Sequence, residues 1–231
     1  GDNMFRSLDS DVWFLDKPFK MMGVELGGRM TIVKLGDGSL LMVSPVAMTS
    51  DDRAELDRIG PVRHIVAPNL MHHLYAGDAK QSYPDAKLYL PPGLSDKRPE
   101  LRHDGILSDQ PPPGLSADLE QHLVLGMPKL NEVVFFHKKS RTLIQTDLAF
   151  NVTQVSSFIV KLLLRFNGAL GGVRATKVLR SLIKDSAATR RSIEKILAWD
   201  FDRMIITHGE VVRSGAKAEL QAAYQFLLGK S

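Results

Sequence analysis

The stretch Pro68-Asn69-Leu70-Met71-His72-His73-Leu74-Tyr75-Ala76-Gly77 follows directly on the run His64-Ile65-Val66-Ala67. The run is mostly apolar, as is typical of a central strand that is buried on both faces of a sheet. Polar residues then come at the carboxyl end of that strand. In layered α/β folds, ligands gather outside the carboxyl ends of strands, where a rigid sheet holds the loops. The stretch therefore predicts a binding site that includes His72 and His73.

Two further apolar runs of the chain also end in residues that can bind a metal. Residues 142–146 lead to Asp147, and residues 204–207 lead to His208. A single histidine or aspartate at a strand end is more often a turn former or a surface group. The adjacent histidine pair also matches no short metal-binding motif. The coincidence of three such strand ends nevertheless favours one metal cluster, with four candidate ligands: His72, His73, Asp147 and His208.

The remaining pattern predicts strands and hairpins in the first half of the chain and helices in the second. Apolar and β-branched runs, with turn signals between them, predict strands over residues 12–15, 30–35, 39–43, 63–67, 87–90, 121–125, 133–137, 142–146 and 203–207. Helices are expected over residues 54–59, 77–83, 152–166, 174–183, 187–199 and 216–228. Residues 95–116 are expected to form an ordered surface loop. The mixture predicts sheets covered by helices in one domain over residues 1–231.

The composition narrows the possible chemistry. The chain has 231 residues, of which 44% are hydrophobic, and it contains no cysteine. Disulfides, thiolate metal sites and cysteine nucleophiles are therefore excluded, and any metal must be held by nitrogen and oxygen atoms. No apolar stretch is long enough for a transmembrane segment. The net charge of +4 is too small to imply nucleic acid by itself. A cytoplasmic location is the expectation.

The order of elements resembles the metallo-β-lactamase-like superfamily, a four-layer αββα sandwich, over residues 12–210. That family carries the motif His-x-His-x-Asp-His after an early strand. In this sequence the two leading histidines of the motif fall on Pro68 and Leu70, the aspartate falls on His72, and the final histidine is kept as His73. Residues 67–77 and 196–202 resemble an uncharacterised bacterial branch of the superfamily.

The resemblance also places the remaining family ligands. A histidine of the family falls near Met127 and is lost, the bridging aspartate matches Asp147, and the last histidine matches His208 in a Thr-His-Gly context. The family's first metal is held mainly by the three positions that are now non-ligands. Its second metal is held by positions that all keep a possible ligand. The resemblance therefore implies the loss of the first metal and the survival of at most one divalent metal: zinc, iron or manganese.

This comparison leads us to expect a divergent metal-dependent hydrolase-like protein that acts on a small molecule. Asp147 and His208 are the candidate catalytic residues, and Asp147 either ligates the metal or orients a histidine. Metal-bound water is the expected nucleophile. The alternative is a non-catalytic member whose degenerate site holds no metal and binds a small anion or a partner. A third possibility, nucleic-acid processing, is disfavoured because Phe166 is the single aromatic residue among the basic ones of residues 161–195.

Residues 152–166 are strongly apolar around Lys161 and Arg165. We expect them to form a buried core helix. A membrane-surface helix, a lid and the face of a homodimer remain alternatives, because exposed apolar patches mark interaction sites.

Overall fold

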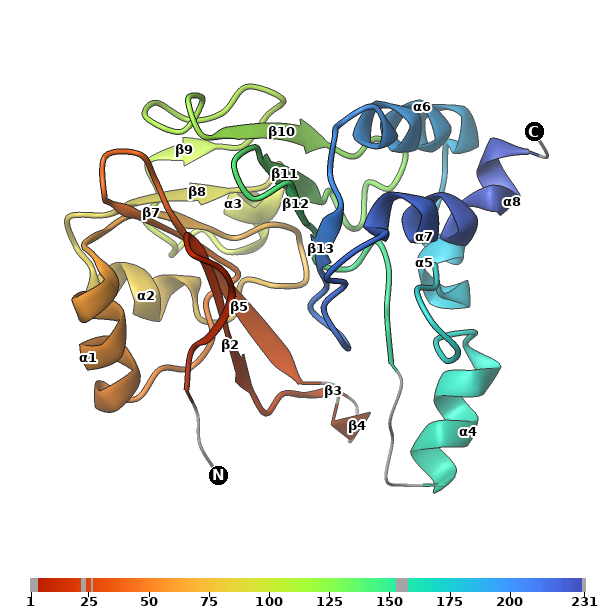
Figure 1. Ribbon diagram of the computed structural model, residues 1–231, viewed down its shortest axis with the longest axis horizontal. Coiled ribbons are helices and arrows are strands. Elements are labelled where there is room, and N and C mark those ends of the chain that lie inside the picture. Colours follow the sequence, from red (N-terminus) through yellow and green to blue (C-terminus); the bar gives the residue numbers. More distant parts are fainter. Residues whose placement is uncertain (1–3, 22–23, 26, 153–157, 230–231) are drawn as a thin grey trace.

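Two β-sheets form the middle of the molecule in the computed structural model, which describes residues 4–21, 24–25, 27–152 and 158–229 (Figure 1). The larger sheet has seven strands in the order β1-β2-β5-β6-β7-β8-β9. Its first four strands are antiparallel, and the pairs from β6 to β9 are parallel. The strands are β1 (Arg6–Asp9), β2 (Val12–Lys17), β5 (Gly28–Lys34), β6 (Leu40–Val43), β7 (Val62–Val66), β8 (Lys87–Leu90) and β9 (Gly105–Ile106).

The second sheet has four strands, and a separate hairpin projects from the first sheet. The four strands follow the order β10-β11-β12-β13, and only β12 and β13 are parallel. They are β10 (Leu119–Leu123), β11 (Val133–His137), β12 (Thr142–Ile144) and β13 (Arg203–Ile205). The hairpin pairs β3 (Lys20–Met21) with β4 (Val24–Glu25).

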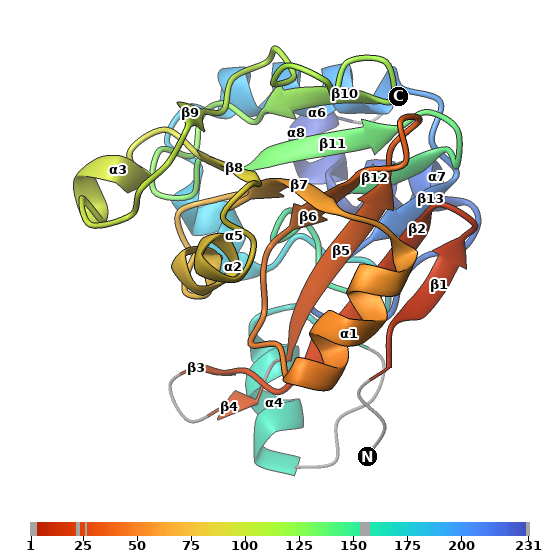
Figure 2. The ribbon, with the colours of Figure 1, turned by 90° about the vertical axis from the view of Figure 1, so that its left-hand side faces the viewer.

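Helices cover the outer face of each sheet, as Figures 1 and 2 show from two directions. On the larger sheet lie α1 (Ser50–Ile59), α2 (Ala76–Ser82) and the short α3 (Leu94–Lys97). On the four-stranded sheet lie α5 (Lys177–Leu182), α6 (Ser186–Leu197), α7 (Ala216–Ala223) and α8 (Gln225–Leu228). The helix α4 (Phe158–Phe166) extends away from these layers. The protein is thus the αββα sandwich that the sequence predicts.

The three largest apolar clusters among the described residues hold these layers together. One joins the larger sheet to α1 and α2, a second lies between the two sheets, and a third joins the smaller sheet to α5, α6 and α7. The side chains of strand β6 pack alternately against two different layers of the fold. Leu40 and Met42 belong to the helix-side cluster, whereas Leu41 and Val43 belong to the cluster between the sheets. This alternation follows from the two-residue period of a strand and explains why β6 is apolar throughout.

Several sequence predictions differ from the structure in detail. The expected surface loop at residues 95–116 contains β9 and part of α3. The expected terminal helix is broken at Tyr224 into α7 and α8. The predicted helix at 152–166 is a helix from Phe158 onward, and residues 153–157 lie outside the described part of the chain. Within the described residues, no helix has the length and apolar character needed to span a bilayer.

The expectation that residues 152–166 form a buried core helix is wrong. Leu162 and Leu163 are 53% and 55% exposed, and Phe166 is 77% exposed. Only Leu164 of the helix's described side chains is buried. The sequence is apolar on several sides, so it could not tell which side would meet the rest of the protein.

The break at Tyr224 has a structural role. The Tyr224 ring lies in the cluster between the smaller sheet and its helices, and its hydroxyl donates a 2.7 Å hydrogen bond to the backbone carbonyl of Leu148. Tyr224 is fully buried. Since Leu148 follows Asp147, this bond ties the C-terminal helices to the loop after β12.

We expect Tyr224→Phe to lower the free energy of unfolding by about 1–2 kcal/mol, because it leaves a buried carbonyl without its donor. Urea denaturation followed by circular dichroism measures the change. Tyr75→Phe, at a half-buried tyrosine, is the matched control and should change stability by less than about 0.5 kcal/mol. Equal stability of Tyr224→Phe and the wild type would contradict this role for the hydroxyl.

Candidate metal centre

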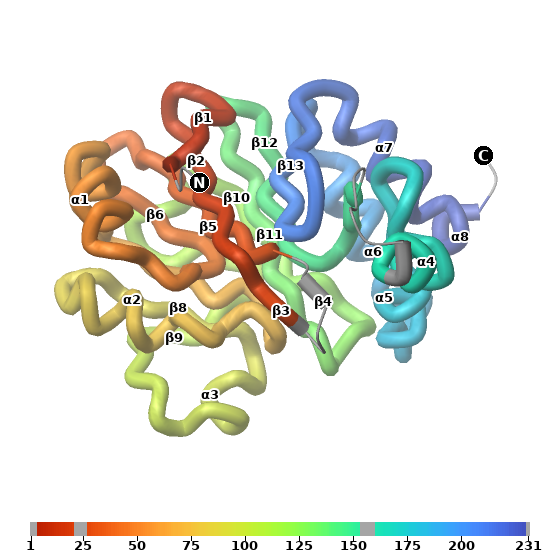
Figure 3. Tube along the Cα trace, turned by 90° about the horizontal axis from the view of Figure 1, so that it is seen from below, coloured from red at the N-terminus to blue at the C-terminus, as the bar shows by residue number. Residues whose placement is uncertain are grey.

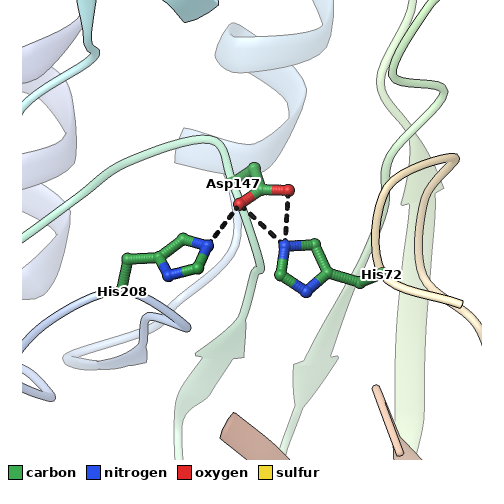
Figure 4. Close-up of side chains that lie close together, drawn as sticks. All are labelled: His72, Asp147 and His208. Atoms are coloured by element: carbon green, nitrogen blue, oxygen red, sulfur yellow. Dashed lines mark hydrogen bonds and ion pairs between the residues drawn. The ribbon is translucent and has the colours of Figure 1, made fainter. Parts of the chain in front are cut away.

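Three side chains from three strand ends meet at one point, shown in Figure 4. His72 comes from the loop after β7, Asp147 follows β12, and His208 follows β13. The Nε2 atom of His72 lies 2.9 Å from Oδ2 of Asp147, and the Nε2 atom of His208 lies 3.2 Å from Oδ1. One donor atom from each of the three residues lies within 4.8 Å of the other two. The cluster could therefore bind a metal ion.

The Asp147 carboxyl is the centre of this cluster and is almost entirely buried. Burial alone would raise its pKa, because a charge is less stable away from water. The neighbouring His72 and His208 act in the opposite direction and hold the pKa of Asp147 well below its usual range. The site is therefore built around a permanent negative charge.

Two polar residues that the sequence analysis did not single out hold this carboxylate in place. Asn69 donates from Nδ2 to Oδ2 of Asp147 over 2.9 Å and to Oε1 of Glu132 over 3.0 Å. The carboxylate of Glu132 accepts hydrogen bonds from the backbone N–H groups of Thr146 and Asp147. Asn69 and Glu132 are both fully buried. Glu132 stands before a strand in a polar segment, where a sequence pattern predicts a surface residue.

Asn69 also shapes the loop that carries His72. Its side-chain oxygen accepts hydrogen bonds from the backbone N–H groups of Met71 and His72, at 2.9 and 2.8 Å. An asparagine that binds the backbone two and three residues further on is a common turn former. The position of Asn69 directly after an apolar strand was the available signal for this role.

His208 is fixed by Arg29 of the other sheet and by its own neighbours in the fold. Arg29 of β5 is buried and donates to the backbone carbonyls of Ile206 and Gly209, at 2.6 and 2.8 Å. Gly209 has a φ of +121°, and a Cβ atom there would lie only 2.1 Å from the carbonyl oxygen of Asn151. Only glycine suits that position. The ring of Phe150 packs against the His208 ring with 4.8 Å between centroids.

His73, the fourth residue predicted for the site, does not join the cluster in the described part of the chain. Its backbone carbonyl accepts a 2.9 Å hydrogen bond from Arg98, and its Nδ1 atom lies 3.3 Å from the same guanidinium. Burial lowers the pKa of His73, and the nearby charges of Lys97 and Arg98 lower it further. The structure thus brings together His72, Asp147 and His208, and places His73 beside two cations.

The three positions where the family resemblance predicts lost ligands are now packing positions. Met127 is buried in the cluster between the smaller sheet and its helices, and Leu70 packs against the cluster under the larger sheet. Pro68 is buried, and its carbonyl accepts a hydrogen bond from the backbone N–H of Val133. Met127 and Leu70 thus pack on the helix sides of the two sheets, and the carbonyl of Pro68 links the loop after β7 to β11.

A small cavity of about 40 Å³ lies on the open side of His72. Its lining includes His73, Arg29, and Ser44 at the carboxyl end of β6. Ser44 has a φ of +59°, which is uncommon for a residue other than glycine. The Arg29 side chain is neutralised there by Asp16, with 2.6 Å between Nε and Oδ1. The cavity adjoins the cluster and has room for about one to three water molecules.

The comparison with solved structures identifies the architecture. A metallo-β-lactamase from Pontibacter korlensis superposes with a TM-score of 0.67 and 12% identity, covering 98% of this chain and 99% of that one. The protein has the metallo-β-lactamase-like fold. A metallo-β-lactamase from Hirschia baltica matches with a TM-score of 0.66 and 12% identity over 99% of this chain and 98% of that one.

A third structure with this metallo-β-lactamase-like fold is that of the Pseudomonas aeruginosa metallo-β-lactamase FIM-1 in its mono-zinc form. It has a TM-score of 0.65 and 14% identity, covering 98% of this chain and 96% of that one. A family model described as a domain of unknown function, DUF4336, matches residues 9–95. A comparison with curated proteins gave no significant match.

The buried Glu132 carboxyl gives the site a measurable pH dependence. Burial, together with the neighbouring Asp147 carboxylate, raises the pKa of Glu132 to about 7 from an ordinary value of 4.5. The folded chain therefore binds this proton more tightly than the unfolded chain. The resulting stabilisation is complete below about pH 4.5 and is lost as the pH rises through about 7.

We therefore expect Glu132→Gln to remove part of the pH dependence of stability between about pH 5 and pH 8. Over this range the free energy of unfolding of the wild type should fall by up to about 3 kcal/mol more than that of the variant. Urea denaturation of chelator-treated protein at both pH values measures it. Every other titratable residue is common to the two proteins, so the comparison isolates the carboxyl at position 132. An identical pH dependence in the two proteins would contradict the raised pKa.

Proposed function

We propose that this protein is a metal-dependent hydrolase-like enzyme with one divalent cation, held by His72, Asp147 and His208. The observation that supports this most directly is the convergence of two imidazole Nε2 atoms on one buried carboxylate. Zinc, iron and manganese all suit two imidazoles and a carboxylate. The cytoplasmic location and the small-molecule substrate expected from the sequence stay predictions.

The chemistry of the donor set fits a cation. An ionised carboxylate can only accept hydrogen bonds, so each Nε2 atom that contacts Asp147 either carries a proton or shares a positive ion with it. Three protein ligands are also the number that a catalytic zinc site uses, since a fourth position stays open for water or substrate. The Pseudomonas aeruginosa structure was determined in a mono-zinc form. The metallo-β-lactamase fold can thus hold a single metal.

The chain's own residues orient this site. A bound divalent cation would supply a Lewis acid that lowers the pKa of water and polarises a substrate carbonyl or phosphoryl group. Asn69 and Glu132 fix the Asp147 carboxylate, and Arg29 fixes the loop of His208. His72 lines the small cavity, so a substrate would approach from that side. Asp147 acts as a ligand, or as an acceptor that orients the two imidazoles.

The first test is the metal content of protein purified without added metal and then supplied with zinc, iron or manganese. We expect about one metal ion per chain in the wild type. His72→Ala, His208→Ala and Asp147→Ala should bind little, because each removes one of three ligands. Inductively coupled plasma mass spectrometry of desalted protein measures the ratio.

Two histidine variants serve as matched controls. His103→Ala removes an exposed histidine that is not part of the cluster, and His73→Ala removes the residue beside Arg98. Both should keep about one metal ion per chain. Loss of metal in His73→Ala alone would show that His73 rotates to become a ligand. A wild-type ratio near zero that no added metal can raise would exclude the proposal in favour of the non-catalytic alternative.

The second test is hydrolysis by the metal-loaded protein. A nitrophenyl ester, bis(p-nitrophenyl) phosphate and a chromogenic β-lactam present a carboxylic ester, a phosphodiester and a lactam amide. We expect turnover of at least one of them, and a loss of about 100-fold or more in kcat/KM for Asp147→Ala and His208→Ala. His103→Ala should keep the wild-type rate. Activity that persists after metal removal would contradict the mechanism.

A further inference from the structure

The helix α4, whose backbone is seen from below in Figure 3, carries an exposed apolar face. Leu162, Leu163 and Phe166 are 53%, 55% and 77% exposed. Leu164 is buried and faces the body of the protein. Because successive residues of a helix are turned by about 100°, Leu162 and Phe166 lie on the side opposite Leu164, and Leu163 lies next to them. The apolar face therefore points away from the protein.

The beginning of α5 extends this apolar face. The backbone N–H groups of Lys177 and Val178 donate to the backbone carbonyl and the side-chain oxygen of Asn167, just beyond α4. Val178 is 58% exposed. The Lys177 ammonium lies 5.6 Å from the centroid of the Phe166 ring. We define the α4 surface as the exposed apolar residues with the cations around them: Leu162, Leu163, Phe166, Val178, Lys161, Arg165 and Lys177.

The charge of this region has one sign. Between Asp147 and Asp185 the sequence contains six lysines and arginines and no aspartate or glutamate. Lys161 and Arg165 are exposed and one helical turn apart, so they lie together beside the apolar face. Lys177 is also exposed. Each of these cations can thus reach an anion that approaches the apolar face.

We propose that the α4 surface docks on an anionic phospholipid membrane. A short helix with an outward apolar face and lysine or arginine at its border suits the headgroup region of a bilayer. Leucine and phenylalanine side chains enter the apolar boundary, and each basic residue is attracted by the negative surface. The charge complementarity selects an anionic membrane over a neutral one.

The same observations disfavour two other occupants. A symmetric pair of α4 surfaces would bring like charges together, because a two-fold interface places one patch against itself and the region has no acidic residue. Single-stranded nucleic acid requires aromatic side chains on which bases can stack. Phe166 is the only exposed aromatic side chain that the structure describes on this surface. In a complex with nucleic acid, the exposed leucines would also stay in contact with water.

The helix α4 is connected along the chain to a residue that binds the loop that carries His208. The chain leaves the cluster through Asn151, which receives a hydrogen bond from Glu210 and donates one to the carbonyl of His208. Val152 forms a bridge with Leu170, on the far side of α4. The helix α4 therefore belongs to a chain segment that leaves the body of the protein beside the cluster and returns there. The docking proposal itself does not depend on the bound metal.

The test is co-sedimentation of the full chain with vesicles. We use phosphatidylcholine alone, and an equal mixture of phosphatidylcholine and phosphatidylglycerol. We expect binding to the mixed vesicles at least about tenfold stronger than to the neutral ones, and weakened by salt. Leu162→Ser/Phe166→Ser and Lys161→Glu/Arg165→Glu should each reduce the partition coefficient at least about tenfold.

Matched controls separate this surface from general effects. Leu125→Ser removes an equally exposed leucine elsewhere, and Lys87→Glu/Lys138→Glu makes the same change in net charge at exposed lysines outside α4. Both should bind like the wild type. Because a serine variant can misfold, Phe166→Trp gives a second measurement. Its fluorescence should shift to shorter wavelength with the mixed vesicles, and that of Ile106→Trp should not.

Equal binding to both kinds of vesicle, or no binding to either, would overturn the proposal. It would also fail if the protein is a dimer in light scattering and the α4 variants convert it to a monomer without vesicle binding by the wild type. RNA binding that is lost in Lys161→Glu/Arg165→Glu, without vesicle binding, would equally contradict it. A negative result in these tests would say nothing about the metal content. The membrane proposal and the metal proposal are therefore tested independently.

Discussion

A buried carboxylate is the constraint around which the site of this protein is organised. Removing the Asp147 charge from water costs free energy unless hydrogen bonds and positive partners replace the solvent. The partners come from separate parts of the fold: His72 and Asn69 from the loop after β7, and His208 from the loop after β13. The two sheets must therefore face each other in one register for this charge to be satisfied.

The strand ends could be predicted from the sequence because sheet geometry is encoded in simple patterns. The apolar runs 63–67, 142–146 and 203–207 indicate where three strands end, and ligands gather outside such ends in layered α/β folds. The direction of each side chain could not be predicted in the same way. His72 and His73 are neighbours, yet one contacts Asp147 and the other lies beside Arg98. Loop conformation decides this, and Asn69 fixes it here.

The supporting residues were missed for a related reason. Glu132 and Arg29 are charged, and charged residues are rarely buried unless they are paired. Each is satisfied by backbone groups far away in sequence: Thr146 and Asp147 for Glu132, and Ile206 and Gly209 for Arg29. No pattern among neighbouring residues in the sequence can indicate such distant hydrogen-bond partners. The helix α4 shows the same limit for apolar residues, since its composition indicates burial but not against what.

Packed side chains occupy the three positions at which the family resemblance predicts lost ligands. Met127 and Leu70 belong to apolar clusters under opposite sheets, and Pro68 connects the strands through its carbonyl. The Asp147 carboxylate is almost entirely buried, and charges interact more strongly where water is excluded. Burial therefore gives Asp147 a strong need for positive charge. Protonated imidazoles can meet this need, and so can a metal cation held between them. A metal cation would bind the carboxylate and both imidazole Nε2 atoms at once, so the arrangement that satisfies the buried charge is also the ligand set of the proposed metal.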